Sequence, residues 1–238
     1  NKLVQKLIIK KLDTVITVSK STKNDLINLL GINLGKINII TEGCRLEDIA
    51  EKEDLPEKFN INKEFFLFVG RHEPYKNISG LIKIYNQLPE NIKNTYLLVI
   101  IGKFDQNTQI LFSLVKKLNE EKRVIFIDSV MPEQLPLFYK KAKILLHLSL
   151  YEGFGLTILE AMRYGLPVIG YNVSSIPEVA GDVGILAEPG NDTDIIENII
   201  KLIDNKELYR DLKFKGIERA KSFTWENSAK QVLEILKL

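Results

Sequence analysis

Short apolar runs that alternate with longer amphipathic stretches constrain the fold of this chain more than any other feature. The runs are nearly continuous Val, Ile, Leu and Phe, which is the pattern of strands whose two faces are both covered by helices. They fall at residues 14–18, 37–40, 65–70, 96–101, 124–127, 144–148, 167–170 and 184–187. The helical patterns fall at residues 21–30, 77–88, 107–121, 132–141, 155–164 and 192–203. This order predicts an α/β fold, with a Rossmann-like parallel sheet and helices on both faces.

The charged stretch at residues 47–63 is the expected boundary, because it contains Pro56 and has no apolar periodicity. Only about two strands and two helices precede it, too few for an independent sheet, whereas a complete doubly wound domain follows. We therefore divide the chain into residues 1–46, a linker at 47–63, a Rossmann-like domain at 64–222 and a final amphipathic helix at 223–238. Thr224 is the expected N-cap of that helix, with Asn227 and Ser228 as alternatives.

The composition argues against several classes of protein. The 33 basic residues nearly balance the 31 acidic ones, for a formal net charge of +2, so no nucleic-acid partner is expected. The single cysteine, Cys44, excludes an intrachain disulfide and fits a reducing compartment. No apolar run approaches the roughly 18 residues of a membrane span. We expect a cytoplasmic protein without a transmembrane segment.

A glycine-bearing turn follows the predicted strand at 144–148 and opens a helix. Gly153 and Gly155 let the backbone approach a ligand closely. The unpaired amides of Gly155, Leu156 and Thr157 would face outward at the positive end of that helix. Such a helix start suits a diphosphate.

Two carboxylates flank this turn. Glu160 lies about one and a half turns into the helix, where its carboxylate could accept protons from a vicinal diol. Glu152, in the turn itself, would lie beside whatever is attached to the phosphates. The plainer alternative is a helix start whose acidic residues complement the helix dipole.

A second candidate element follows the strand at 65–70. Arg71 and Lys76 flank a turn with Pro74, and Asn77 could cap the next helix. Two cations at a strand terminus could neutralise a diphosphate, Arg as a fork and Lys as a point charge. The alternative is two ordinary surface cations.

The remaining polar and aromatic candidates have simpler interpretations. His147 reads as a core histidine, with contact to the site as the alternative. His72 is expected to be exposed in a turn, and Tyr151 and Phe154 are expected to pack rather than stack on a base. No cluster has metal-ligand spacing, so we expect no metal and no cofactor.

Four motifs stand in order along the chain: Gly70-Arg71 with Lys76-Asn77; Glu152-Gly153-Phe154-Gly155-Leu156 with Glu160-Ala161-Met162; Gly165-Leu166-Pro167-Val168-Ile169; and Ser174-Ser175-Ile176-Pro177-Glu178 with Gly181-Asp182 and Gly184. Together they resemble the group 1 (family four) retaining GT-B glycosyltransferases, over essentially the whole chain. The resemblance implies an enzyme of two Rossmann-like domains, of which residues 64–222 would be the carboxyl-terminal, nucleotide-sugar-binding one.

The resemblance also implies roles for individual residues. Arg71 and Lys76 would contact the diphosphate and, with Glu152, be catalytic. Glu160 would hold the ribose, Glu152 the donor sugar, and the loop at 128–131 would flank the base. The implied donor-binding set is Gly70, Arg71, Lys76, Asp128, Val130, Glu152, Gly153, Phe154, Gly155, Leu156, Thr157 and Glu160. Transfer would proceed by front-face attack without a metal, with cations stabilising the leaving diphosphate.

The chain departs from this family in two respects. The acceptor-binding domain is missing, so residues 1–46 are interpreted as its remnant and the chain as a fragment or half of a split enzyme. Glu42-Gly43-Cys44-Arg45 stands where the family often has Asn-Gly-Val-Asp. The acceptor is expected to be a glycan or a lipid-linked glycan, as in polysaccharide biosynthesis, and membrane docking of the intact enzyme stays open.

Residues 172–178 slightly favour a mannosyltransferase that uses GDP-mannose, while UDP-sugars remain open. Two further hypotheses remain. The chain could be a non-catalytic nucleotide-sugar-binding subunit, or a ligand-free α/β scaffold with its four charged candidates spread over the surface.

Overall fold

A computed structural model describes residues 8, 9, 11–44, 55 and 57–236 of the chain. In this described part, the larger sheet has six parallel strands in the order β5-β4-β3-β6-β7-β8. The strands are β3 (Glu64–Val69), β4 (Tyr96–Ile101), β5 (Val124–Ile127), β6 (Ile144–His147), β7 (Val168–Tyr171) and β8 (Ile185–Ala187). The predicted Rossmann-like parallel sheet is therefore confirmed, and its strand order reverses between β3 and β6.

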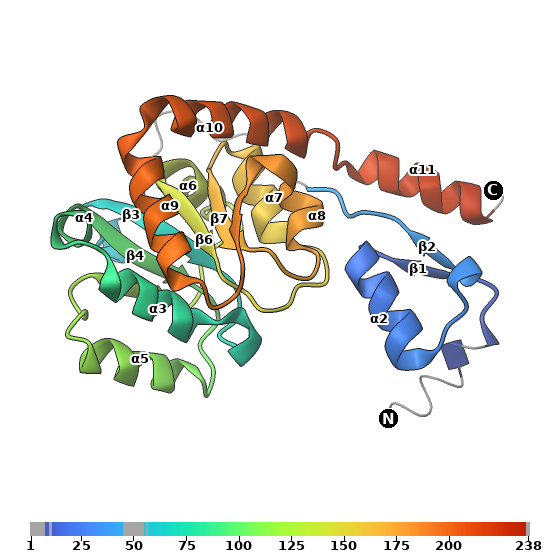
Figure 1. The fold of residues 1–238 in the computed structure, drawn as a ribbon, viewed down its shortest axis with the longest axis horizontal. Helices are drawn as coiled ribbons and strands as arrows, with labels where there is room; N and C mark the ends of the chain where they lie inside the picture. The colour runs from blue at the N-terminus through green and yellow to red at the C-terminus, as the bar shows by residue number, and fades with distance from the viewer. Residues whose placement is uncertain (1–7, 10, 45–54, 56, 237–238) are drawn as a thin grey trace.

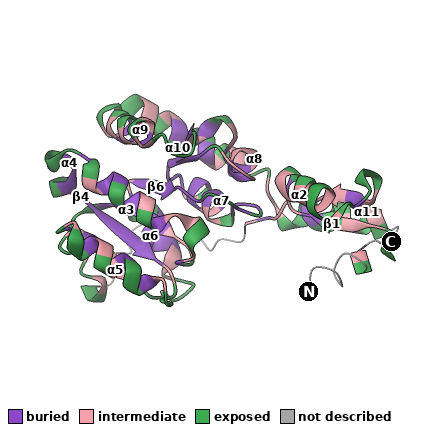
Figure 2. Cartoon of the chain, turned by 60° about the horizontal axis from the view of Figure 1, so that its bottom comes forward, coloured by how far each residue is buried: buried purple, intermediate pink, exposed green. Residues whose placement is uncertain are grey.

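Helices cover both faces of this sheet (Figure 1). They are α3 (Ile78–Gln87), α4 (Glu90–Thr95), α5 (Thr108–Lys117), α6 (Leu135–Lys141), α7 (Leu156–Arg163), α8 (Ile176–Ala180), α9 (Asp192–Asp204) and α10 (Lys206–Ala220). Alternate residues of β3 point to opposite faces: Phe66 and Phe68 pack with α3, α5 and α9, whereas Phe65 and Leu67 pack with α6, α7 and α8. Figure 2 shows the buried strands between helices whose outer faces are exposed.

Three of these helices had no counterpart in the sequence patterns. Helices α4 and α8 have six and five residues, too few to show a period. Helix α10 is mostly charged, and its buried positions are Leu212, Gly216 and Ala220. Two of these three positions are small residues, so the helix shows only a weak apolar period. Helix α5 ends before its predicted limit, because Asn119 takes a φ of 58° in the left-handed region.

The amino-terminal part forms a separate small sheet, in which β1 (Val15–Thr17) pairs in parallel with β2 (Ile37–Ile39) beside α2 (Lys20–Leu30). Helix α11 (Trp225–Leu236) crosses back to this part (Figure 1). Ser228 Oγ donates to Thr41 O at 2.6 Å, and Cys44 N donates to Phe223 O at 3.4 Å. The predicted cap is confirmed, since Thr224 Oγ1 accepts from Asn227 N at 3.1 Å.

Most of the predicted linker at 47–63, including Pro56, lies outside the described residues, and so do Arg45, residues 1–7 and residues 237–238. Within the described part, none of the helices combines the length and the apolar character needed to cross a membrane.

Candidate functional site

The candidate site lies at the carboxyl ends of β3 and β6, where the strand order reverses. The turn after β3 ends in a 3-10 helix at Pro74–Lys76. Leu150 N, in the loop after β6, donates to Tyr75 O at 2.8 Å and joins the two loops. Lys76 Nζ donates to Glu152 Oε1 and Oε2 at 2.7 and 2.9 Å. Two predicted site residues separated by 76 positions are thus in direct contact, whereas a scaffold with scattered charges would keep them apart.

Glu152 has a second partner in His147, at the end of β6. His147 is fully buried, stacks on Phe68 and places Nε2 at 2.9 Å from Glu152 Oε1. An ionised carboxylate only accepts hydrogen bonds, so Nε2 donates to Glu152. The other ring nitrogen, Nδ1, lies 3.4 Å from Thr157 Oγ1. His147 is therefore both a core residue and a site residue, which unites the two interpretations of its sequence position.

Glu152 stays ionised although it is buried. Burial acts to raise the pKa of its carboxyl, but the hydrogen bonds and charges of His147 and Lys76 outweigh burial and lower that pKa to about 2. Only 11% of the Glu152 side chain and 14% of the Lys76 side chain are exposed. The pair therefore forms a shielded, charge-assisted contact.

Hydroxyl groups hold the backbone of the same loop. Ser174 Oγ and Ser175 Oγ donate to Glu152 O at 2.5 and 2.9 Å. Ser19 Oγ and Thr22 Oγ1, from the amino-terminal part, donate to Gly153 O at 2.7 and 3.1 Å. The loop is thus clamped from both parts of the chain.

The start of α7 leaves its first backbone amides without a side-chain cap in the described part of the chain. Gly155, its N-cap, has a φ of 116°, a backbone conformation that favours glycine. Among the described residues, no side chain caps this helix. Its first amides, those of Leu156 and Thr157, are therefore open to a ligand. A Cβ at Gly153 would meet only open space.

Two aromatic residues beside these glycines pack or bond elsewhere in the chain. Phe154 is buried and packs edge-on against Phe223 at a centroid distance of 5.9 Å, as expected. Tyr151, which was expected to pack, is half-exposed, and its hydroxyl donates to Asp25 Oδ2 at 2.7 Å.

Glu160 forms a second cluster. Tyr139 Oη, from α6, donates to Glu160 Oε2 at 2.6 Å. Burial raises the pKa of Glu160, and the hydrogen bond from Tyr139 acts in the opposite direction. Burial and then the charge of Glu160 raise the pKa of the neighbouring Cys44 thiol to about 12. The Cys44 thiol therefore keeps its proton near neutral pH and is a poor nucleophile.

Arg71 lies at the end of β3, but its guanidinium points into solvent. Its side chain is 78% exposed, and Nη1 lies 3.3 Å from Glu73 Oε1. Such an exposed pair is weak and leaves the side chain able to move to a ligand. Gly70 lies beneath Lys76: a Cβ at Gly70 would stand 3.9 Å from Lys76 Cδ.

Two sequence predictions near this turn are wrong. His72 is buried, not exposed, and its Nδ1 lies 2.8 Å from Thr108 Oγ1. Room for its ring comes from Gly102, whose Cβ would stand 3.1 Å from His72 Nε2. Asn77 occupies the N-cap position of α3 without a side-chain cap bond, because its φ of 52° turns the side chain toward Gly80.

The side chain of Asp128, in the loop after β5, is bonded to a neighbouring loop of the chain. Asp128 Oδ1 accepts from Phe104 N at 2.5 Å, and so ties this loop to the one after β4. Val130 is partly buried against the core. The half-exposed ring of Phe104, which no sequence pattern singled out, lies at the same edge. Among the described residues, no group of His, Cys, Asp and Glu side chains could hold a metal ion.

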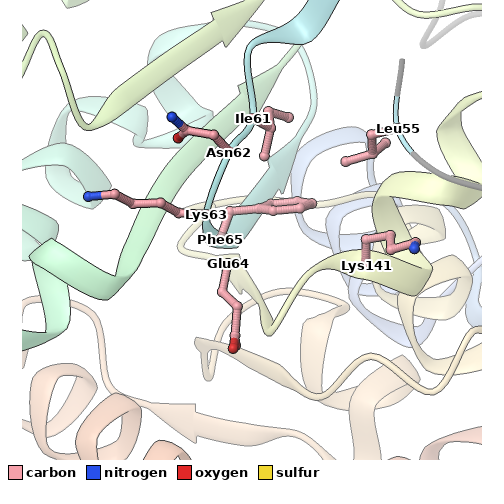
Figure 3. Close-up of a pocket in the computed structure, with 7 residues that line it drawn as sticks. All are labelled: Leu55, Ile61, Asn62, Lys63, Glu64, Phe65 and Lys141. Carbon is pink, nitrogen blue, oxygen red and sulfur yellow. The ribbon is translucent and has the colours of Figure 1, made fainter. Parts of the chain in front are cut away.

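One cavity lies elsewhere. It has a volume of about 460 Å³ and is lined by Leu55, Ile61, Asn62, Lys63, Glu64, Phe65 and Lys141. Figure 3 shows Lys63 and Lys141 extending to opposite sides of Phe65. This cavity opens at the amino end of β3, so it is at the opposite end of the strand from the candidate site.

Comparison with known proteins agrees with this geometry. Residues 51–219 match the family model described as Glycosyl transferases group 1. The chain is 34% identical over 230 residues to the O-antigen chain mannosyltransferase B of Escherichia coli, across 94% of this chain and 60% of that protein. This chain therefore spans about three fifths of that relative's length.

Two solved structures share the fold. Sucrose-phosphate synthase from Thermosynechococcus elongatus has a TM-score of 0.85 and 26% identity, over 99% of this chain and 60% of that one. Anabaena HepE in complex with UDP and glucose has a TM-score of 0.86 and 20% identity, over 99% and 66% of the two chains.

Proposed function

The chain belongs to the group 1 glycosyl transferase family, and on that premise we propose that it binds a nucleotide-diphosphate sugar where β3 and β6 end. The glycosyl group is transferred, with retention of configuration, to a glycan or lipid-linked acceptor. The observation that carries this proposal is the shielded Lys76–Glu152 pair beside the uncapped start of α7. It places a cation, a carboxylate and open amides in one place, as a charged sugar donor requires.

Each part of the donor has a partner in this proposal. The diphosphate binds Lys76, the amides of Leu156 and Thr157, and Arg71 after its side chain leaves Glu73. The ionised Glu152 accepts hydrogen bonds from the sugar hydroxyls. Glu160 binds the ribose, and the loops holding Asp128 and Val130 flank the base. Residues 64–222 thus form the donor domain, and residues 1–46 belong to the acceptor side.

The reaction follows from these contacts. The bond between the anomeric carbon and the donor phosphate breaks, and the acceptor oxygen bonds to the same face of that carbon. The acceptor proton passes to the leaving phosphate oxygen. Lys76, Arg71 and the α7 amides stabilise the charge that develops on the diphosphate, which is the main catalytic effect. Because these groups supply the positive charge, a chelator is expected to leave nucleotide binding unchanged.

We propose GDP-mannose as the donor, with UDP-sugars as the alternative. The mannosyltransferase from Escherichia coli supports mannose. Ser174 and Ser175, in the stretch that suggested mannose, bond to the backbone of Glu152. Their hydroxyls therefore support the loop, and the preference for mannose rests on the relative.

A calorimetric titration tests the proposal. GDP, UDP and ADP, each alone and with a sugar attached, are titrated into the wild-type chain, into Lys76→Ala and into Lys83→Ala. Lys83 is an exposed lysine on α3 and serves as the matched control. We expect the wild type to bind nucleotides of one base. Lys76→Ala should lose about tenfold or more in affinity, because a charged hydrogen bond is removed. Lys83→Ala should bind with the wild-type affinity. Equal affinities for all three proteins would show that the site lies elsewhere.

A further inference from the structure

The carboxylate of Glu160 is held on one side only. Tyr139 Oη donates to Oε2 at 2.6 Å, the length of a hydroxyl bond to an ionised carboxylate. Oε1 has no such partner among the described residues, and no Lys, Arg or His in this part of the chain forms an ion pair with Glu160. One carboxylate oxygen is therefore committed inside the protein and the other is left for a ligand.

The donor of this bond is rigid. Tyr139 is 1% exposed and packs in the core beneath α7. Its ring stacks on that of Tyr164, with centroids 5.9 Å apart and an interplanar angle of 14°. Burial raises the pKa of the Tyr139 hydroxyl well above its usual range, so the hydroxyl keeps its proton and remains a donor.

We propose that Tyr139 is a positioning residue for nucleoside recognition: it fixes the Glu160 carboxylate so that Oε1 receives the ribose hydroxyls of the donor. This inference rests on the proposed function. A buried carboxylate without a cation has few ways to hold one orientation, and a rigid hydroxyl donor supplies one. Tyr139 acts through Glu160 and needs no contact with the nucleotide itself.

The groups around Glu160 give a second readout. Tyr139 faces it from α6, Cys44 from the segment after β2, and Tyr164 stacks on Tyr139 from the end of α7. Arg163 lies near Cys44. Because the Tyr139 bond lowers the pKa of Glu160, its loss should keep Glu160 protonated to a higher pH. A protonated carboxyl accepts ribose hydroxyls less well.

The experiment compares Tyr139→Phe with Tyr85→Phe. Tyr85 is also fully buried, and its hydroxyl donates to Tyr96 O at 2.8 Å, so the control loses an equivalent bond. The probes are GDP or UDP, whichever the wild type binds, and its 2′,3′-dideoxy form. We expect the wild type and Tyr85→Phe to prefer the ribose form by about tenfold or more.

In Tyr139→Phe the preference for the ribose form should fall to about threefold or less. As the pH is lowered, the remaining preference should disappear at a higher pH than in the wild type. Unchanged preference and pH profile would overturn the inference. If Tyr139→Phe does not fold, Glu160→Gln is measured instead. This variant keeps an acceptor for the Tyr139 hydroxyl but removes the charge of the carboxylate. A ribose preference that is retained in Glu160→Gln would also overturn the inference. A wild-type chain that binds no nucleotide would instead overturn the proposed function.

Discussion

At the scale of single residues, Glu152 is the centre of the site. Its carboxylate is shielded from solvent and bonded to Lys76 and His147. Removing one partner of such a pair leaves a buried charge, which costs more than the bond itself contributes. The affinity of the site for its ligand and the stability of the folded chain therefore both depend on the Glu152 carboxylate.

The first residue-scale prediction concerns ligand selectivity. In Glu152→Gln, Lys76 loses its charged partner and is free to meet a phosphate. We expect the variant to bind free nucleoside diphosphate as tightly as the wild type or a few-fold tighter. It should bind the sugar nucleotide about tenfold more weakly, because an ionised acceptor for the sugar hydroxyls is gone. Titration with both ligands measures the ratio, and equal losses for both would count against Glu152 as the sugar ligand.

The second concerns pH. The pKa of Glu152 is lowered to about 2 from the ordinary value of 4.5, so the unfolded state binds the proton first as pH falls. The carboxylate therefore contributes stability above about pH 4.5, on the order of 3 kcal/mol, and this is lost as pH falls toward 2. Urea unfolding at pH 7 and at pH 3 should show a smaller difference in Glu152→Gln than in the wild type.

Glu234→Gln, an exposed site on α11, should keep the wild-type pH dependence. An identical loss of stability on acidification in Glu152→Gln would mean that Glu152 is not held in its ionised form.

At the scale of elements, the start of α2 is docked on the loop that carries Glu152. Glu178, on α8, accepts from Lys20 N at 2.7 Å and from Ser21 N at 2.8 Å. One carboxylate from the large sheet thus caps a helix of the small one, in addition to the cap from Ser19. Together with the hydroxyls of Ser19 and Thr22 on Gly153 O, this cap joins the amino-terminal part to the site.

Glu178→Ala should loosen that junction. Loss of a charged cap costs about 1–2 kcal/mol, and hydrogen exchange should rise in the first turn of α2 and in the loop around Gly153. Glu197→Ala, an exposed position on α9, is the control and should leave both segments protected. Exchange that rises evenly over the whole chain would indicate a general loss of stability and not a local junction.

At the scale of the whole molecule, α11 unites the two parts, and its start lies close to the segment that follows β2. A Cβ at Gly43 would stand 2.2 Å from Trp225 N, a backbone atom that cannot turn aside. The half-buried Cys44 and its neighbour Glu160 lie next to this crossing. A change at the crossing is therefore expected to reach Glu160.

Gly43→Ala should force the start of α11 away from the segment that follows β2, at a cost of about 1–3 kcal/mol for overpacking. Thermal unfolding measures that cost. Gly35→Ala is the matched control, because its Cβ would make only an ordinary contact at 3.5 Å with Asn33 Oδ1. Equal stability of the two variants would show that the approach of Gly43 to Trp225 is not tight in solution.

The sequence by itself determined the architecture, because short apolar runs such as Tyr96–Ile101, set between amphipathic stretches, favour strands covered on both faces. It also placed Lys76 and Glu152 at strand ends, and the carboxyl ends of parallel strands share one edge of a sheet. The sequence also placed Gly155 in a turn between a strand and a helix. Its φ of 116° in the structure is a backbone conformation that favours glycine.

Only the tertiary structure decided which groups meet. His72 is buried beside Gly102, in the loop after β4, where a Cβ would stand 3.1 Å from His72 Nε2. Glu160 is held by Tyr139, 21 positions away on a different helix. Such contacts depend on how helices pack across a sheet, and local periodicity reports which face a residue takes but not which side chain it finds there.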